Sequence, residues 1–490
     1  QYGGMMLREL RNYGYLLEDP LITDWLQGVG GRLGSDSDNP QQSYTFFMMR
    51  DRQINAFATL GGYIGVNAGL VVTAETEAEV AGVLAHEIAH VSQRHVLRAV
   101  ERARKDQIPI LLAMIGAIAA SQAAGSSSAD SSDSSSNATA AAITGAMALM
   151  AQRQIDYTRA NESEADRVGI QTLARSGYEP NGMADFFERM QKANRGNSGG
   201  YQVPEYLRSH PVTSTRISET RQRAQKLVAE RPAAAAAAQT PASLLLPAIY
   251  RLGGGSAAGL GENYGWVRER LRVLSAKDPA AALREYRAMA RAPGSRTTDG
   301  QRYGLALAQL RGGYPAEAEA TLDELLQRHP QHLWLELARA EAAAVAGRRT
   351  VANERFDALL ARHPDSRPVR LTYAQALGEA ATPAAGRRAQ EVLRPLLASS
   401  AQDPVFQRNF ARASELAGDI VRAGEAYAET AYLNGRAVDA LNQLAGLMKR
   451  DDLDYYQRAR IEARMAAITP VVLEMQRQGV RPEEQKPDRQ

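Results

Sequence analysis

The feature that most constrains this chain is an H-E-x-x-H motif, His86-Glu87-Ile88-Ala89-His90, within a segment of helical apolar spacing. Two histidines four residues apart on a helix project from one face, where both imidazoles can bind a single metal ion. Zinc suits imidazole ligands and tolerates an open fourth position, beside which Glu87 would act as a general base. The motif is typical of zinc hydrolases, most often peptidases.

The alternative is a surface helix on which two histidines happen to share a face. The residues around the motif disfavour this alternative, because glutamates before it complement the positive end of a helix dipole and an apolar stripe runs through it. Such a helix would be buried, and buried histidines need polar partners. The glutamates are Glu75, Glu77 and Glu79, and the stripe is Val80, Val83, Leu84, Ile88 and Val91.

A second helical segment, starting near Asn161 and running to Ala174, supplies candidate carboxylates. Glu162 and Asp166 are four residues apart and share a face, whereas Glu164 points elsewhere. One of the pair can bind the metal while the other orients a ligand histidine from behind. An acidic helix face is otherwise usually a solvated face, and this reading stays open without the histidine motif.

In combination, these motifs resemble the metallopeptidases related to HtpX, the mitochondrial Oma-type proteases and the CAAX prenyl proteases. The resemblance covers roughly residues 1–230, and its blocks occur in the family's order. Within the family the chain most resembles the periplasmic proteases that enhance β-barrel assembly. The further blocks are Asn55 to Ile64, which resembles the edge strand before the motif helix, Arg159 to Gly169, and Ser209-His210-Pro211 followed by Arg216.

The resemblance implies a role for each matching residue. One Zn²⁺ per chain would be bound by His86, His90 and Glu162. Glu87 would be the general base, and Asp166 would hold His86 or its neighbour in place.

His210 and Arg216 keep more than one reading. The resemblance implies that His210 lies at the open side of the metal, either as a fourth, inhibitory ligand or as a group that stabilises the oxyanion. Imidazole chemistry allows both roles, and a satisfied loop histidine before proline is the alternative. Arg216 would contact the substrate or brace the site.

We expect the first domain, residues 1–230, to be an α+β zincin-like metallopeptidase, mostly helical with a small sheet. Ser43 to Met49 and Ala56 to Val66 read as strands, with Gly61-Gly62 as a break or bulge. A strand beside a metal cleft can bind an extended peptide along the sheet edge. Asn55, Ala56 and Phe57 are the substrate-binding candidates, and unfolded segments are the expected substrates.

An insertion at residues 106–151 contains two apolar segments, 108–120 and 141–151, on either side of a serine-rich stretch from Ser126 to Asn137. Each segment is shorter than the roughly 20 residues needed to span a bilayer. The pair would form either a hairpin that contacts the membrane surface peripherally or two core helices. The serine-rich stretch is expected to be a loop.

The second half of the chain is expected to be an all-α tetratricopeptide-repeat domain at residues 266–477, after a linker at 231–265. A period near 34 residues relates its apolar, small-residue and His-Pro positions, which predicts about four or five helix pairs with a concave binding surface. His329 and His363 belong to this period and are not expected to be ligands. Residues 478–490 read as a disordered tail.

Charge and composition exclude some functions. The formal net charge of +3 forms no basic stripe, so nucleic-acid binding is not expected, and the lack of cysteine excludes thiol chemistry. A cysteine-free chain fits the periplasm, and the start at Gln1 fits a form whose signal peptide has been removed. His95 does not match the third histidine of metzincins and is expected to brace the site or cap the helix.

Two functions remain. The first is a zinc endopeptidase that degrades misassembled outer-membrane β-barrel proteins and assists their assembly. His210 would keep it latent, and its repeats would bind the β-barrel assembly machinery or the client. The second is a chaperone or scaffold that acts through the repeats while its protease site is mostly silent.

Overall fold

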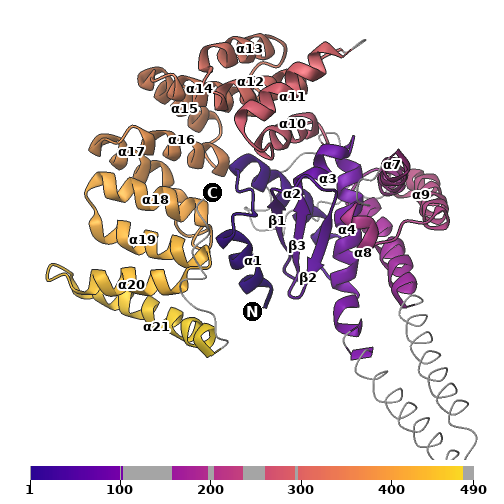
Figure 1. Cartoon of the computed structure of the whole chain (residues 1–490), viewed down its shortest axis with the longest axis horizontal. Helices are drawn as coiled ribbons and strands as arrows, with labels where there is room; N and C mark the ends of the chain where they lie inside the picture. Colours follow the sequence, from indigo (N-terminus) through magenta and orange to yellow (C-terminus); the bar gives the residue numbers. More distant parts are fainter. Residues whose placement is uncertain are drawn as a thin grey trace, which may run out of the picture.

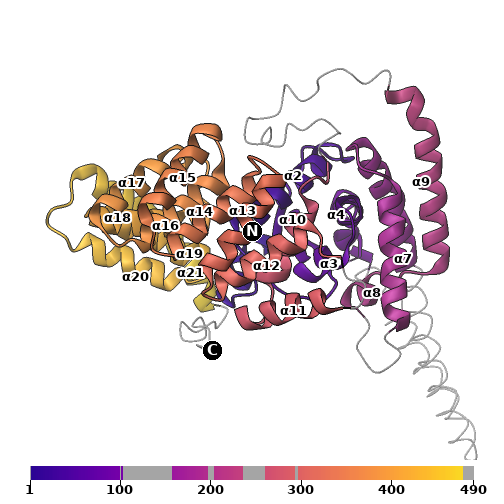
Figure 2. The same ribbon diagram turned by 90° about the horizontal axis from the view of Figure 1, so that it is seen from above.

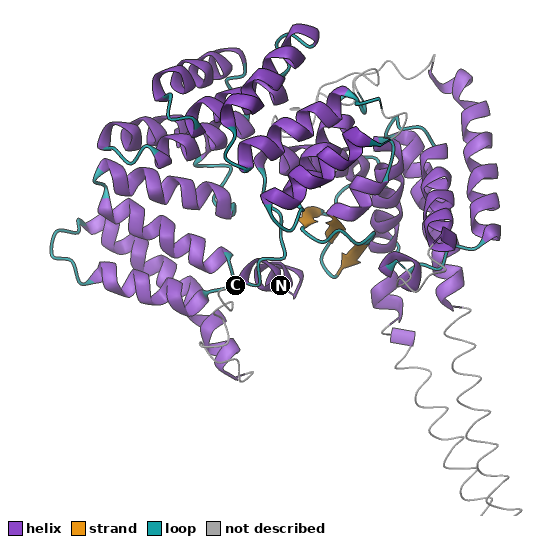
Figure 3. Ribbon diagram, turned by 45° about the horizontal axis from the view of Figure 1, so that its top comes forward, coloured by secondary structure: helices purple, strands orange, loops and turns teal. Residues whose placement is uncertain are grey.

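The chain folds into an N-terminal α+β region and a C-terminal region that is entirely helical where it is described. The computed structural model describes residues 2–99, 101–102, 157–196, 204–235, 260–292 and 296–477. This mostly helical architecture with a small sheet confirms the fold class expected for the N-terminal half (Figure 3). The insertion 106–151, with its two apolar segments and serine-rich stretch, and the tail 478–490 lie outside the described residues.

The N-terminal region is built around one three-stranded sheet. Its strands are β1 (Thr45–Met49), β2 (Ala56–Thr59) and β3 (Tyr63–Asn67). Its helices are α1 (Tyr2–Asn12), α2 (Pro20–Ser35), α3 (Ala68–Thr73), α4 (Glu77–Ser92), α7 (Asn181–Gly196), α8 (Glu205–Ser209) and α9 (Ser214–Ala235). Residues 157–175 are also helical.

The sheet has the order β1-β3-β2, with β3 parallel to β1 and antiparallel to β2. The segment expected as one interrupted strand is therefore a hairpin, because Gly61 and Gly62 adopt φ values of +89° and +82° that reverse the chain. β2 lies at the sheet edge, as expected. Asn67 donates its backbone N–H to the carbonyl of Asn55, so by antiparallel alternation Ala56 and Ala58 direct their backbone groups away from β3.

Helix α4 carries the H-E-x-x-H motif through the core of this region. Thr76 caps its first turn by accepting a hydrogen bond from the backbone N–H of Glu79. Nearly every residue from Val80 to Ala89 is buried, since α4 packs against α2, α7 and β2. The motif helix is thus a buried helix, as its apolar stripe predicts.

The C-terminal helices pack each against the next along the chain. The pairs α12–α13, α14–α15 and α16–α17 begin at Asp299, Leu333 and Arg367, so each pair begins 34 residues after the one before. This spacing agrees with the predicted period, while the tetratricopeptide identity of the helices stays a prediction. The elements are α10 (Tyr264–Leu274), α11 (Pro279–Arg291), α12 (Asp299–Arg311), α13 (Pro315–Arg328), α14 (Leu333–Val345), α15 (Arg349–Arg362), α16 (Arg367–Glu379), α17 (Pro383–Leu393), η4 (Arg394–Leu396), α18 (Pro404–Ala417), α19 (Ile420–Leu433), α20 (Ala437–Met448) and α21 (Tyr455–Arg477).

The C-terminal helices curve around α1 and α2, which lie on the inner side of the arc (Figure 1), while α7 and α9 lie on the opposite side of the molecule (Figure 2). Arg270 of α10 makes a buried ion pair at 2.7 Å with Asp19, the N-cap of α2. Tyr264 also donates its hydroxyl to the carbonyl of Val71. The two regions therefore share a polar and apolar interface.

The ends of the predicted linker 231–265 are helical. Helix α9 continues through Ala235 and α10 begins at Tyr264, two residues before the expected start of the repeats. Residues 236–259 lie outside the described part of the chain. Among the described residues, none of the helices combines the length and the apolar character that crossing a membrane requires.

Candidate active site

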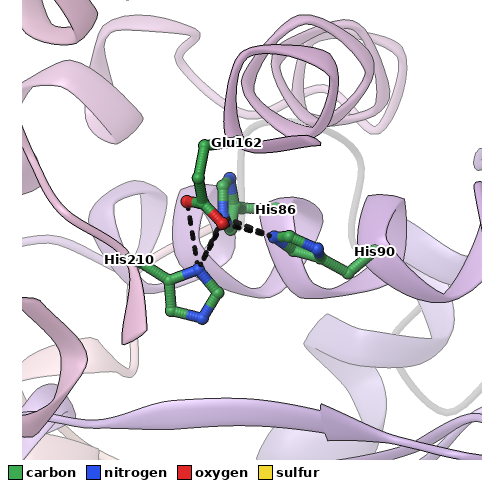
Figure 4. Close-up of side chains that lie close together, drawn as sticks. All are labelled: His86, His90, Glu162 and His210. Carbon is green, nitrogen blue, oxygen red and sulfur yellow. Dashed lines mark hydrogen bonds and ion pairs between the residues drawn. The ribbon is translucent and has the colours of Figure 1, made fainter. Parts of the chain in front are cut away.

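Four side chains from three separate segments converge on one point (Figure 4). His86 and His90 come from α4, Glu162 comes from the helical residues 157–175, and His210 is the C-cap of α8. One ligand atom from each lies within 4.8 Å of the others. Nε2 of His86 is 3.0 Å from Nε2 of His90, and Nδ1 of His210 is 3.0 Å from Glu162 Oε1.

These four residues form a donor set that fits a divalent metal. Three imidazoles and one carboxylate are ligands that zinc accepts in a tetrahedral arrangement. His86 and His90 present Nε2 to the cluster, while their Nδ1 atoms contact other side chains. The carboxylate of Glu162 is buried, so a cation at this point would offset the cost of its desolvation.

Asp166 supports His86 from behind. Its Oδ1 lies 2.9 Å from Nδ1 of His86, and both side chains are almost fully buried. Arg216 donates two hydrogen bonds to the same carboxylate, from Nε at 2.7 Å and from Nη2 at 2.8 Å. Nη1 of Arg216 also lies 3.0 Å from Glu162. These contacts tie Arg216 to two of the carboxylates at the site, while its expected role, to contact the substrate or to brace the site, stays a prediction.

Charges within the cluster shift the pKa values of its members. Burial lowers the pKa of His86, but the hydrogen bonds that its ring donates to Asp166 and Glu162 outweigh this effect and raise the pKa to about 10. Burial dominates at His90 and lowers its pKa to about 3. The pKa of Glu162 is lowered, because hydrogen bonds from the surrounding histidines outweigh its burial. A metal-free cluster at neutral pH therefore holds a proton on His86 and ionised carboxylates, and a bound metal would take the place of that proton.

Glu87 lies beside the cluster, and its carboxylate accepts a hydrogen bond from the backbone N–H of Ala58. Its Oε1 is buried and has no hydrogen-bond partner among the described residues, and Nε2 of His210 lies 3.6 Å away. Burial raises the pKa of Glu87, although the backbone hydrogen bond from Ala58 opposes the rise. That hydrogen bond places Glu87 beside β2, on the side that faces away from β3.

The expected substrate-binding residues lie at the start of β2, and they do not all face the same way. Asn55 and Phe57 line a cavity of about 530 Å³. Oδ1 of Asn55 is buried and has no hydrogen-bond partner within the part of the chain that the structure describes. Ala56 is instead completely buried, backbone included, so it lines no accessible surface in this structure. The remaining lining residues are Met49, Asp51, Asn67, Glu205, Arg208 and Ser209.

The structure adds one residue that the sequence motifs do not identify, Tyr206, and shows what His95 and Glu164 contact. Tyr206, on α8, is fully buried and stacks on His210 with ring centroids 4.7 Å apart. His95, which was expected to brace the site or cap the helix, contacts His90. Glu164 points away from the metal cluster, as expected, and contacts His95. No spacing rule marks Tyr206, because its contact depends on where α8 packs.

Comparison with known proteins agrees with this geometry. The model of Peptidase family M48 matches residues 20–224. The putative beta-barrel assembly-enhancing protease of Vibrio cholerae is 39% identical over 229 residues, which is 46% of this chain and 44% of that protein. The beta-barrel assembly-enhancing protease of Yersinia pestis is 28% identical over 463 residues, which is 94% of this chain and 86% of that protein. Metalloprotease LoiP of Escherichia coli is 27% identical over 199 residues, which is 40% of this chain and 69% of that protein.

The strength and the extent of these similarities differ. The alignment with the Vibrio cholerae protein spans less than half of that relative, whereas the more distant Yersinia pestis protein aligns with nearly the whole chain. The resemblance drawn from the motifs is confirmed by the family match, which includes every residue of the four-ligand cluster. Residues 20–224, which contain the four-ligand cluster, therefore match the model of Peptidase family M48.

Proposed function

We propose that this chain is a zinc-dependent endopeptidase in which His86, His90 and Glu162 hold one Zn²⁺ and Glu87 is the general base. The observation that carries the proposal is the convergence of four metal-binding side chains beside a buried carboxylate whose Oε1 has no hydrogen-bond partner among the described residues. Zinc bound there supplies Lewis-acid polarisation of the scissile carbonyl and lowers the pKa of the attacking water. Glu87 is placed to accept that proton and deliver it to the leaving amine.

His210 is proposed to keep the site latent. Its Nδ1 lies 3.4 Å from Nε2 of His86 and within hydrogen-bond distance of Glu162, so it occupies the position that a substrate carbonyl would need. Stacking on Tyr206 holds the ring in this place. Activation then requires His210 to move away from the metal, and a displaced, protonated His210 could instead stabilise the oxyanion.

The edge of β2 is the proposed substrate-binding strand. Ala56 and Ala58 direct their backbone groups away from β3, and the N–H of Ala58 donates to Glu87, so a peptide that paired along this side of β2 once it is uncovered would pass the general base. Oδ1 of Asn55 offers an acceptor for a peptide N–H, and Phe57 offers an apolar contact in the adjoining cavity. Backbone pairing of this kind selects extended chain rather than a particular sequence.

The substrates and partners follow from the relatives. Proteins named for enhancing β-barrel assembly align with this chain, so we propose misassembled or unfolded outer-membrane β-barrel proteins in the periplasm as substrates. The helices α10–α21 would bind the client or the β-barrel assembly machinery, and the protease would assist assembly as well as degradation. Peripheral membrane contact through residues 106–151 remains part of this proposal.

One observation favours a second function. His210 lies within the metal-binding cluster, 3.0 Å from Glu162. If it remained a metal ligand at all times, the protease site would be mostly inactive, and the chain would act as a chaperone or scaffold through its C-terminal helices. The two functions differ in what the removal of His210 does to proteolysis.

The test is cleavage of a purified, urea-unfolded outer-membrane β-barrel protein by wild type, Glu87→Gln and His210→Ala. Latency predicts slow cleavage by wild type, faster cleavage by His210→Ala, and none by Glu87→Gln or after treatment with a zinc chelator. Loss of cleavage in His210→Ala would assign the histidine to transition-state stabilisation. Absence of cleavage in all three zinc-loaded proteins would favour the scaffold.

A further inference from the structure

His90 contacts a side chain that the proposed ligand set does not include. Its Nδ1 lies 2.8 Å from Nδ1 of His95, which is 3% exposed. Nε2 of His95 in turn lies 3.0 Å from Oε2 of Glu164, and Arg98 donates to the same oxygen at 2.7 Å. A continuous chain of four side chains therefore leads from the metal cluster to the surface.

The proton positions along this chain follow from the cluster itself. His90 presents Nε2 to the metal site, and a metal ligand uses its lone pair, so the proton of its neutral ring must lie on Nδ1. Nδ1 of His90 then donates to Nδ1 of His95, which leaves the proton of His95 on Nε2. That N–H donates to the ionised carboxylate of Glu164. Every hydrogen bond in the chain then has one donor and one acceptor.

The backbone is bent in a way that makes this contact possible. In a continuous helix, residues five apart point about 140° away from each other, so His95 would lie far from His90. Helix α4 ends at Ser92, and Arg94 adopts a left-handed φ of +55° before helical residues resume at 95. A non-glycine residue pays a small strain energy in this region. The turn returns His95 to the same side as His90.

We propose that His95 and Glu164 are positioning residues that orient His90 as a metal ligand and fix its tautomer. A ligand histidine whose second nitrogen donates to an acceptor keeps its ring orientation and becomes more basic. His86 has this support directly from Asp166, whereas His90 receives it through an intervening imidazole. The inference rests on the metal site of the proposed function and extends it by two residues.

The experiment measures the zinc dissociation constant of the full chain by competition with a chromophoric chelator, without any assay of proteolysis. Loss of a supporting partner of this kind weakens metal affinity by about 10- to 100-fold. We expect that loss for His95→Leu and a weaker effect for His95→Asn, whose Oδ1 can still accept from His90. Glu164→Gln removes the anionic end of the chain at a side chain that is 29% exposed, so it tests the inference even if His95→Leu does not fold.

His332→Leu is the matched control, since it makes the same substitution at a histidine of α14's N-cap, far from the cluster in the sequence and outside the site. It should bind zinc as wild type does. Zinc affinity within about twofold of wild type in both folded His95→Leu and Glu164→Gln would overturn the inference while leaving the metal site intact. Absence of zinc binding by wild type would overturn the proposed function and this inference together.

Discussion

The two ligand histidines of α4 are supported in contrasting ways. His86 is held by Asp166 and Arg216, whose side chains are 1% and 11% exposed, whereas the support of His90 ends at Glu164 and Arg98, which are 29% and 43% exposed. A buried ion pair that loses one partner leaves an uncompensated charge, but a surface pair contributes little to stability. The residues that orient His86 should therefore also contribute strongly to the stability of the fold, whereas the residues that orient His90 should contribute little.

The largest expected effect comes from breaking the buried support. Asp166→Ala removes the carboxylate that pairs with the buried guanidinium of Arg216 through two hydrogen bonds, so the free energy of unfolding should fall by about 3 kcal/mol or more. Chemical denaturation of the zinc-free protein measures this loss. Removing both charges, in Asp166→Ala combined with Arg216→Met, should restore part of the lost free energy of unfolding. If the losses of the two single variants simply add in the double variant, the two residues do not form one unit.

The next effect is the pH dependence of the zinc-free protein. The pKa of His86 is raised to about 10 in the folded state, above its ordinary value near 6.5. A raised folded-state pKa stabilises the protein fully below about pH 6.5, and this contribution is lost as the pH rises through about 10. Unfolding measured from pH 6 to 10.5 should therefore show a decline in wild type that is much smaller in His86→Gln. Equal declines in both proteins would contradict the assignment of the proton to His86.

Breaking the exposed support should change stability much less. Glu164→Gln removes a partly exposed pair with Arg98, so the free energy of unfolding of the zinc-free protein should change by less than about 1 kcal/mol. The same denaturation experiment as for Asp166→Ala gives a direct comparison. A loss as large as that of Asp166→Ala would show that the two supports are equally integrated into the fold.

A similarly small effect is expected at the turn that directs His95 towards His90. Arg94→Gly should stabilise the protein slightly or leave it unchanged, since glycine adopts the positive φ of +55° without strain while also gaining freedom in the unfolded state. Arg94→Val should cost about 1 kcal/mol, because a β-branched residue is strained there. Thermal unfolding compares the two, and equal stabilities would argue against strain at this position.

Much of the site could be predicted because its residues follow local spacing rules. His86 and His90 share a helix face, as do Glu162 and Asp166, and the structure brings all four together. His95 escapes such rules, since its contact depends on the helix break at Arg94. Neither glycine nor proline, the residues that usually indicate a helix break, occurs between Ser92 and His95.

The same limit applies to the fold. The sheet was foreseeable from β-rich segments, but one expected strand is a hairpin, because two glycines with positive φ allow a full reversal rather than a bulge. The interface between the two regions, with the ion pair of Asp19 and Arg270, joins residues that are 251 positions apart. Contacts at such separations depend on how whole helices pack, and no local pattern encodes them.

The most direct test of the account is the zinc content of purified Glu87→Gln, determined together with its cleavage of an unfolded protein. The carboxylate of Glu87 lies beside the metal cluster but is not one of its four ligands. We therefore predict about one zinc per chain, as in wild type, and no detectable cleavage. A Glu87→Gln variant that still cleaves while the wild-type activity is zinc-dependent, or a wild type that holds no zinc, would contradict the central claim.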